Sequence, residues 1–230
     1  MPNTHFDPQF AERPSTIHAG LSRPGWTMEQ VVQSAVIGRD RSSSMLGDKA
    51  RDADAAAKGL VEALAAPENR GAFSVGVIDF ASDVRIAMPL TKATDLVKAI
   101  PPLAPSGWTN ITGALVEAKK MLDAQITMTG CGIRSARPVV ILFSDGHHTV
   151  GEVPHAAAAA LKADADVVTV AFGSDADEAL LTAIATSPSH FYRCRDGKEL
   201  RKFFAAVGGA LSRSIARGGN AGAALATIAP

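Results

Sequence analysis

Residues 31–45 read VVQSAVIGRDRSSSM, and this short stretch holds the strongest indication of the architecture. It begins with a run rich in Val and Ile, as in a strand that is buried on both faces of a parallel sheet. The run stops at Gly38, and a carboxylate and three hydroxyls follow directly, from Asp40 to Ser44. Polar side chains just after a buried strand predict a binding site, because open α/β sheets bind ligands at the carboxyl ends of their strands.

On either side of this stretch, buried strands alternate with amphipathic helices. We expect further strands at 73–80, 84–88, 138–144, 167–172 and 190–193, and helices at 49–66, 90–100, 111–122, through 156–160, at 175–186 and at 199–215. The short gap between the strands at 73–80 and 84–88 favours a hairpin. The order predicts an α/β fold of the Rossmann-like kind, with an open, doubly wound, mostly parallel sheet, one antiparallel edge strand and helices on both faces.

The length of 230 residues suits one domain with tails. Residues 1–29 carry four prolines and neither helical nor strand periodicity, so they are expected to form an extended N-terminal arm. The domain is then expected over residues 30–216. Residues 217–230 are rich in Gly and Ala and are expected to form a flexible tail.

Composition excludes several classes of protein. The 23 basic and 23 acidic side chains balance, which disfavours binding to nucleic acid or to an anionic membrane. The first 30 residues hold charges and prolines with no continuous apolar region, so no secretory signal is expected. No apolar run of about 18 residues occurs, so no membrane span is expected. The two cysteines, Cys131 and Cys194, are expected at opposite ends of the sheet, where they form neither a disulfide nor a zinc site. A cytoplasmic location is expected.

Three junctions place oxygen-bearing side chains at one edge of the predicted sheet. They are Asp40 to Ser44, Ser106 to Asn110, and Ser144 to Gly146. Two carboxylates and three hydroxyls, with no thiolate, suit Mg²⁺ or Mn²⁺ rather than zinc or copper.

Each junction also has a simpler explanation. In these explanations the serines cap the helix near Gly47, Thr109 caps the helix from Ile111, and Asp145-Gly146 forms a turn. The coincidence of all five side chains at one edge favours the metal site over these separate explanations.

From about residue 31 to residue 215 the chain resembles the von Willebrand factor A domain. The metal-ion-dependent adhesion site of that family has an Asp-x-Ser-x-Ser motif, a distant Thr and a distant Asp. Asp40, Ser42 and Ser44 match the first motif, Thr109 the second and Asp145 the third.

The resemblance implies a function as well as a fold. In the family, the hydroxyls bind the ion directly, at least one Asp acts through a water, and a Glu or Asp of a partner protein completes the shell. The expected function is therefore metal-dependent protein–protein interaction, not catalysis, by a monomer or a component of a hetero-complex. The chain looks like the small intracellular bacterial members, which include those of tellurium-resistance and stress systems.

Two positions depart from the family pattern. An aliphatic residue usually precedes the first Asp, whereas this chain has Arg39, which either pairs with Asp40 or, as we favour, points to solvent. A second, adjacent metal site would need two acidic residues after the motif. Gly47 occupies the first of these positions and Asp48 the second, so a second ion is not expected.

The rim around the metal is expected to include Trp108, Arg41, Ser43, His147 and His148. Trp108 either anchors a partner or packs under its loop, and the two histidines either shape the rim or are simply solvated.

Two other functions stay open. One is a scaffold whose metal site has decayed. The other is a phosphatase of the haloacid dehalogenase type that uses Asp40, Thr109, Lys162 and Asp145. That chemistry needs a second Asp two residues after the first, where this chain has Ser42.

Overall fold

A computed structural model describes residues 30–126, 133–218 and 220–228. The expected N-terminal arm, residues 1–29, and Cys131 lie outside the described residues.

The sheet has the strand order β3-β2-β1-β5-β6-β7, and the short strand β4 pairs with β1 at its start. All neighbours are parallel except β2 and β3, which form the expected antiparallel hairpin at one edge. The predicted fold class is therefore confirmed. The strands are β1 (Gln30–Asp40), β2 (Phe73–Phe80), β3 (Val84–Lys92), β4 (Ile133–Ser135), β5 (Val139–Ser144), β6 (Asp166–Phe172) and β7 (Phe191–Cys194).

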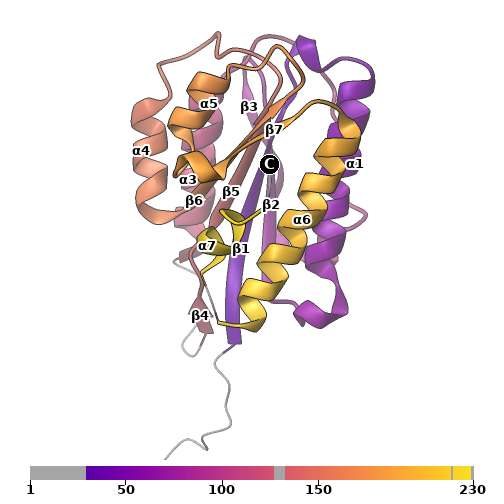
Figure 1. The fold of residues 1–230 in the computed structure, drawn as a ribbon, viewed down its shortest axis with the longest axis vertical. Coiled ribbons are helices and arrows are strands. Elements are labelled where there is room, and N and C mark those ends of the chain that lie inside the picture. Colours follow the sequence, from indigo (N-terminus) through magenta and orange to yellow (C-terminus); the bar gives the residue numbers. More distant parts are fainter. Residues whose placement is uncertain (1–29, 127–132, 219, 229–230) are drawn as a thin grey trace, which may run out of the picture.

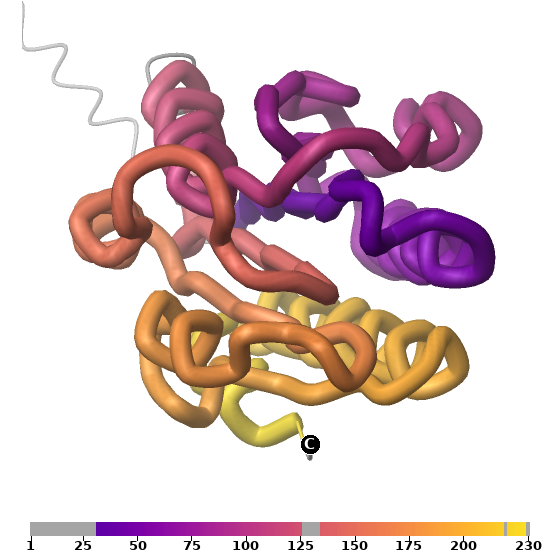
Figure 2. Tube along the Cα trace, turned by 90° about the horizontal axis from the view of Figure 1, so that it is seen from above, coloured from indigo at the N-terminus to yellow at the C-terminus, as the bar shows by residue number. Residues whose placement is uncertain are grey.

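Helices cover both faces of the sheet (Figures 1 and 2). On one face α1 and α6 lie side by side, and on the other lie α3, α4 and α5. The helices are α1 (Asp48–Ala65), α2 (Ala93–Leu96), α3 (Ile111–Ile126), α4 (His155–Asp164), α5 (Glu178–Ile184), α6 (Gly197–Ala216) and α7 (Ala221–Leu225), with 3-10 turns at Ser43–Met45, Pro67–Asn69 and Pro188–His190.

The central strand β1 contributes to two separate cores. Ala35 and Ile37 point into the core beneath α1 and α6, while Val36 points into the core beneath α3 and α4. Successive side chains of a strand face opposite sides of the sheet, so a strand segment that is covered on both sides is apolar at consecutive positions. This explains the unbroken apolar run of residues 35–37.

Two predicted helices are shorter than expected. The helix predicted at 90–100 was wrong for its first residues, because β3 continues to Lys92 and only Ala93–Leu96 is helical. The helix predicted at 175–186 spans only Glu178–Ile184, since the Asp177 side chain accepts a hydrogen bond from Leu180 N and caps its start.

Helix α7 lies within the stretch that was expected to be a flexible tail. Ala221 and Leu225 are buried, and the Tyr192 hydroxyl donates to the Leu225 carbonyl. Asn220 caps the helix by accepting from Gly222 N. Composition alone indicated fraying, but contacts with β7 and α6 order this segment.

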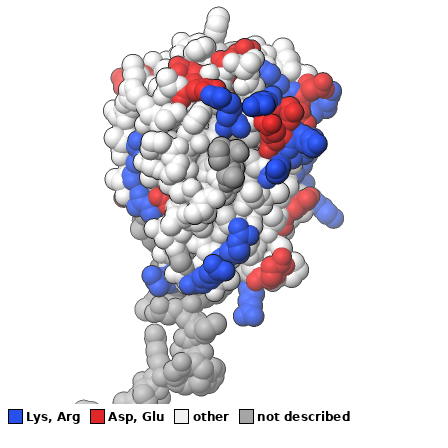
Figure 3. All heavy atoms as spheres, in the orientation of Figure 1, with Lys and Arg blue, Asp and Glu red and all other residues white. Residues whose placement is uncertain are grey.

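Charged side chains of both signs are interspersed on the face shown in Figure 3, with a wide uncharged area between them. Among the described residues, no helix is both long enough and apolar enough to cross a membrane.

Candidate metal centre

Asp40 is the last residue of β1, and its carboxylate is fully buried beneath the loops at the carboxyl edge of the sheet. One oxygen accepts from the backbone N–H of Ser42 at 2.7 Å, and the other accepts from the Ser144 hydroxyl at 2.5 Å. These two bonds fix the orientation of the carboxylate from both sides.

The serines of the first motif lie directly against the third motif. The Ser42 and Ser44 hydroxyl oxygens are 2.9 Å apart. Ser44 also donates to one oxygen of Asp145 at 2.6 Å, although the two residues are 101 positions apart in the chain. Parallel pairing of β1 with β5 brings their carboxyl ends together and so places these residues at one point.

Thr109 lies at the same place and belongs to the loop that precedes α3. Its backbone N–H donates to the Thr149 hydroxyl at 2.9 Å, and Thr149 N donates back to the Thr109 carbonyl at 2.9 Å. A Cβ placed on Gly146 would lie 3.6 Å from the Ser44 hydroxyl and 3.7 Å from that of Thr109. Gly146 therefore lies between the two hydroxyls, and a Cβ there would be in ordinary van der Waals contact with both.

Ser42, Ser44, Thr109 and Asp145 all line one hollow of about 540 Å³ that is open to solvent. Asp40 does not line the hollow but lies below its floor. The structure thus brings all five predicted residues together.

The simpler capping roles do not account for these side chains. Ser42 makes no side-chain capping bond to the turn that it precedes. At α3, Asn110 is the cap, since its Oδ1 accepts from Gly113 N at 2.8 Å. The Thr109 hydroxyl is therefore left for the hollow, and the Asp145 carboxylate bonds to Ser44 rather than within its own turn.

The centre carries negative charge on the carboxylates of Asp40 and Asp145, which are buried from solvent. Burial raises the pKa of Asp40 to about 6, against the lowering effect of hydrogen bonds from Ser144 and Ser42, and the Asp145 charge raises it further. Lys49 of α1 balances part of the charge, because its ammonium donates to the second oxygen of Asp145 at 2.5 Å.

A hard divalent cation fits this set of donors. Carboxylate and hydroxyl oxygens are the ligands that Mg²⁺ and Mn²⁺ prefer, and a cation would compensate the buried charge of Asp40. Within the described part of the chain, no group of three or more His, Cys, Asp or Glu side chains is placed to hold a metal. The oxygen-rich character of the centre thus depends on its hydroxyls.

The structure places only some of the expected rim residues around the hollow. Trp108 is 66% exposed beside the hollow, so it does not pack under its loop. Ser43 also lines the hollow, and its hydroxyl donates to the Gly107 carbonyl at 3.1 Å. Arg41 differs from the expectation: its guanidinium is buried, donates to the Ser106 hydroxyl at 2.7 Å and pairs with Asp83.

The two histidines have different environments. His147 is exposed, lines the hollow and lies 3.3 Å from Asp177, an ion pair when the imidazole is protonated. His148 turns away from the rim, and its Nδ1 accepts from Ile111 N at 3.2 Å at the start of α3. It therefore acts as a structural residue of the helix terminus.

Arg39 neither pairs with Asp40 nor points to solvent. Its side chain is fully buried on the opposite face of the sheet, as the alternation of a strand requires. Its guanidinium donates to Asp79 and Asp54 at 2.8 Å each and to the Pro101 carbonyl at 3.2 Å. The preference for solvent was thus wrong, because two carboxylates on β2 and α1 compensate the buried cation.

Three residues that bond to the five predicted residues were not predicted as part of the site: Ser144, Lys49 and Thr149. Ser144 directly precedes Asp145, so strand alternation places its hydroxyl and the Asp145 carboxylate on different sides of the strand end. The position of Ser144 next to Asp145 was the feature of the sequence that could have identified it. Lys49 and Thr149 carry no local signal, because only the tertiary fold brings them to the centre.

The sequence matches the family model of the von Willebrand factor type A domain over residues 36–206, about three quarters of the chain. No curated protein matches the sequence.

Several solved structures share the fold. Proximal thread matrix protein 1 from the mussel byssus is 23% identical, with a TM-score of 0.67 over 81% of this chain and 48% of that chain. Another structure of this mussel protein, 21% identical with a TM-score of 0.62, covers 81% of this chain and 48% of that one and has a zinc-occupied adhesion motif of the metal-ion-dependent type. The von Willebrand factor type A protein from Catenulispora acidiphila is 19% identical, with a TM-score of 0.66 over 80% of this chain and 43% of that chain. The present chain thus spans about half the length of these proteins or less.

Proposed function

Because the chain belongs to the von Willebrand factor type A domain family, we propose that it is a metal-dependent module that binds an acidic residue of a partner protein. The observation that carries the proposal is the convergence of three hydroxyls and the Asp145 carboxylate at one solvent-open hollow, with the Asp40 carboxylate buried directly beneath it. The metal would be Mg²⁺ or Mn²⁺.

Asp40, Ser42, Ser44, Thr109 and Asp145 would hold the ion. The ion would supply a positive charge with an incomplete shell, which a Glu or Asp of the partner completes. The protein's own residues orient the site: Ser42 N–H and Ser144 fix the Asp40 carboxylate, and Ser44 fixes that of Asp145. Nothing in this arrangement requires a bond of the partner to be broken.

Trp108 is the side chain best placed to add affinity beyond the acidic residue. It is large and exposed next to Thr109, and aromatic residues of this kind are enriched among the few that dominate binding energy. A partner that presents an acidic side chain with an adjacent apolar surface would suit the hollow and this ring.

The test is thermal unfolding of EDTA-treated protein before and after the addition of excess MgCl₂ or MnCl₂. We expect the metal to raise the melting temperature of the wild type, and Asp40→Ala to abolish the rise. Asp175→Ala is the matched control, since Asp175 is an exposed acid that lines the same hollow outside the ligand set. An equal metal response in Asp40→Ala would contradict the proposal.

Partner binding has its own experiment. An affinity pull-down in Mg²⁺ and in EDTA, with Asp40→Ala as control, should recover the partner only when metal and Asp40 are both present. Partner binding that persists in EDTA, together with no heat of Mg²⁺ binding in calorimetry, would favour a scaffold with a decayed site.

The phosphatase alternative is disfavoured by the side chain two residues after Asp40. Ser42 stands where that chemistry needs an acid or base, and the Ser42 hydroxyl lies against Ser44. Magnesium-dependent release of phosphate from p-nitrophenyl phosphate, lost in Asp40→Asn, would revive this alternative. The cytoplasmic location, the bacterial stress role and the monomeric or hetero-complex state stay predictions.

A further inference from the structure

Strand β7 is the edge of the sheet that lies opposite the β2–β3 hairpin, and β6 is its only neighbour in the strand order. A hollow of about 430 Å³ runs along its last residues, between the strand and α6. We call this hollow the β7 groove and define it by Tyr192, Phe203 and Ile228, which are apolar, and by Arg193, Arg195 and Lys202, which are basic.

The backbone along this groove has a free hydrogen-bonding edge. Gly173 N donates to the Cys194 carbonyl, so Cys194 faces β6. Alternate residues of a parallel strand bond to the same neighbour, which leaves the N–H and C=O of Arg193 directed away from β6. Among the described residues, none outside the sheet bonds to these two groups.

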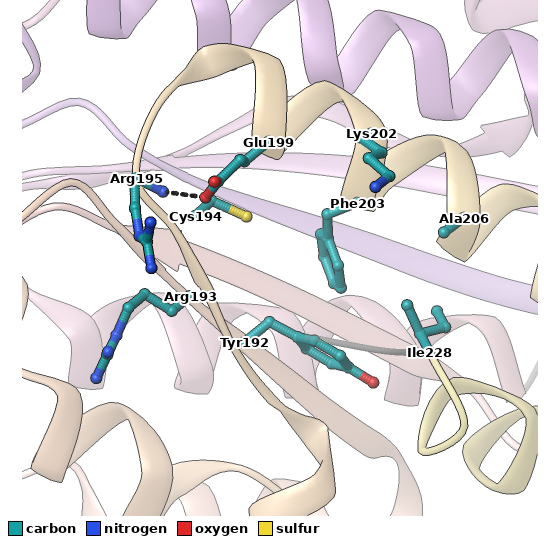
Figure 4. Close-up of a pocket in the computed structure, with 9 residues that line it drawn as sticks. All are labelled: Tyr192, Arg193, Cys194, Arg195, Glu199, Lys202, Phe203, Ala206 and Ile228. Carbon is teal, nitrogen blue, oxygen red and sulfur yellow. Dashed lines mark hydrogen bonds between the residues drawn. The ribbon is translucent and has the colours of Figure 1, made fainter.

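Along β7, basic side chains lie on one face of the strand and apolar side chains on the other. Figure 4 shows Arg193 and Arg195 on one side of β7, and Tyr192 and Cys194 on the other, toward Phe203 of α6. An added strand would meet cations on one face and aromatic and aliphatic carbon on the other.

The acids near the groove neutralise only part of its positive charge. Glu178 pairs with Arg193, and Glu199, which also lines the groove, accepts from Arg195 N at 2.8 Å. The side chains of Arg195 and Lys202 are exposed and have no acidic partner among the residues that the structure describes. The groove is therefore complementary to a negatively charged occupant.

The thiol in the groove is not a reactive group. Burial, with Glu199 and Asp196 nearby, raises the pKa of Cys194 to about 12, so the thiol stays protonated at neutral pH. The groove is suited to binding rather than to covalent chemistry.

We infer that the β7 groove binds an extended acidic segment of a partner protein by strand addition. The segment carries acidic side chains that alternate with apolar ones. Its backbone pairs with Arg193, its acidic side chains meet Arg195 and, at the α6 side of the groove, Lys202, and its apolar side chains pack on Tyr192, Phe203 and Ile228. This surface is separate from the metal centre, which lies at the carboxyl ends of β1 and β5.

The test uses a labelled synthetic peptide of about nine residues, long enough for one strand, in which Val and Glu alternate. Binding is measured by fluorescence anisotropy in EDTA with the Asp40→Ala protein, so that the metal centre contributes nothing. Two comparison peptides have alternating Val and Lys, and the Val and Glu composition with the Glu residues grouped at one end. We expect only the alternating Val and Glu peptide to bind, with hydrogen exchange at the Arg193 amide slowed in the complex.

Two substitutions address the cations directly. Arg195→Glu and Lys202→Glu should each weaken binding by about tenfold or more, because a like charge then faces the acidic segment. Lys198→Glu is the control, since Lys198 is exposed on the same helix and does not line the groove. Equal binding of the grouped peptide, no binding of the alternating one, or an equal loss of binding in Lys198→Glu would overturn the inference. The cations would then serve only to prevent edge-to-edge aggregation of the sheet. Because the assay excludes metal, its failure would not bear on the proposed metal site.

Discussion

Asp40 and Arg39 are neighbours in sequence and both are buried, but only Arg39 has partners of opposite charge. Arg39 is fully buried but meets two carboxylates and a carbonyl, so its charge is compensated within the protein. Asp40 is equally buried, yet its partners are a backbone N–H and hydroxyls, and its nearest charge is another carboxylate. A buried anion that lacks a cation is costly, and a site that binds metal has to tolerate this cost when the metal is removed.

The first prediction concerns the pH dependence of the metal-free protein. The pKa of Asp40 is about 6 in the folded state against 3.8 ordinarily, so the folded state binds more protons than the unfolded one between these values. Stability from this group is present below about pH 4 and is lost as the pH rises through about 6, by about 3 kcal/mol for two pKa units.

Asp40→Asn, which cannot ionise, measures this effect. In EDTA, the free energy of unfolding of the wild type should fall relative to Asp40→Asn between about pH 4 and pH 7, as urea titrations would show. Excess Mg²⁺ should restore the wild type at pH 7 and leave Asp40→Asn unchanged. Parallel pH profiles of the two proteins in EDTA would contradict the assignment.

The second prediction concerns Lys49, whose ammonium competes with a metal ion for the charge of Asp145. Lys49→Met should increase Mg²⁺ affinity by roughly three- to tenfold, a modest factor because Lys49 is a third exposed and solvent screens its charge. Isothermal titration calorimetry measures the change. Lys58→Met, on the same helix, should have no effect, and a lower affinity in Lys49→Met would instead show that the ammonium supports the site.

At the scale of elements, the loop of residues 97–110 has no regular structure but is held at many points. Asp54 of α1 accepts from Leu103 N at 3.0 Å, the Arg41 carbonyl accepts from Ser106 N at 2.7 Å, and the Ala81 carbonyl accepts from Asn110 N at 2.9 Å. Together with the bond from Arg39 to the Pro101 carbonyl, these contacts fix the segment that carries Thr109. These contacts therefore hold Thr109 in a fixed position beside the other residues of the candidate site.

The third prediction follows from the ion pairs that hold this loop. Arg39→Met leaves Asp79 with only the half-exposed Arg85 and removes the cation that bonds Asp54, so the free energy of unfolding should fall by about 3–5 kcal/mol. In Arg39→Met with Asp79→Leu the loss should be smaller than the sum of the two single losses. The exposed pair of Arg51 and Asp48 provides the control, since Arg51→Met should cost less than about 1 kcal/mol. A similar small loss for Arg39→Met would show that its burial is energetically unimportant.

Elements with a strong periodic pattern were predictable. The buried strands β1, β5 and β6 and the amphipathic helices α1, α3 and α6 follow from runs of Val and Ile and from helical spacing of apolar residues. The short elements β4, α2 and α7 were missed or misjudged, because tertiary contacts rather than local sequence decide segments of three to five residues. At the candidate site, the convergence of the five oxygen-bearing residues was predictable from motifs, whereas Lys49 and the burial of Arg39 and Arg41 depend on side chains distant in sequence.

At the scale of the whole molecule, the candidate metal centre and the β7 groove lie at different parts of the sheet. The candidate metal centre occupies the carboxyl ends of the central strands, while α7 packs near the β7 edge (Figure 1), where the Tyr192 hydroxyl donates to the Leu225 carbonyl. The balanced total charge does not describe either place, because the metal centre is locally negative and the β7 groove is locally basic.

The last prediction tests this separation with a chain that ends at Gly218 and so lacks α7. Its removal exposes the surface that the fully buried Leu225 covers and takes away the carbonyls that accept from Tyr192 and His190, so the free energy of unfolding should fall by about 2–4 kcal/mol. Leu225→Ala should cause a smaller loss of the same sign. The Mg²⁺-induced rise in melting temperature should persist in both proteins, because no residue of α7 lines the hollow that holds Ser44 and Thr109. If the truncated chain remained folded but lost its metal response, the edge at β7 and the centre at β1 would be coupled through the sheet rather than independent.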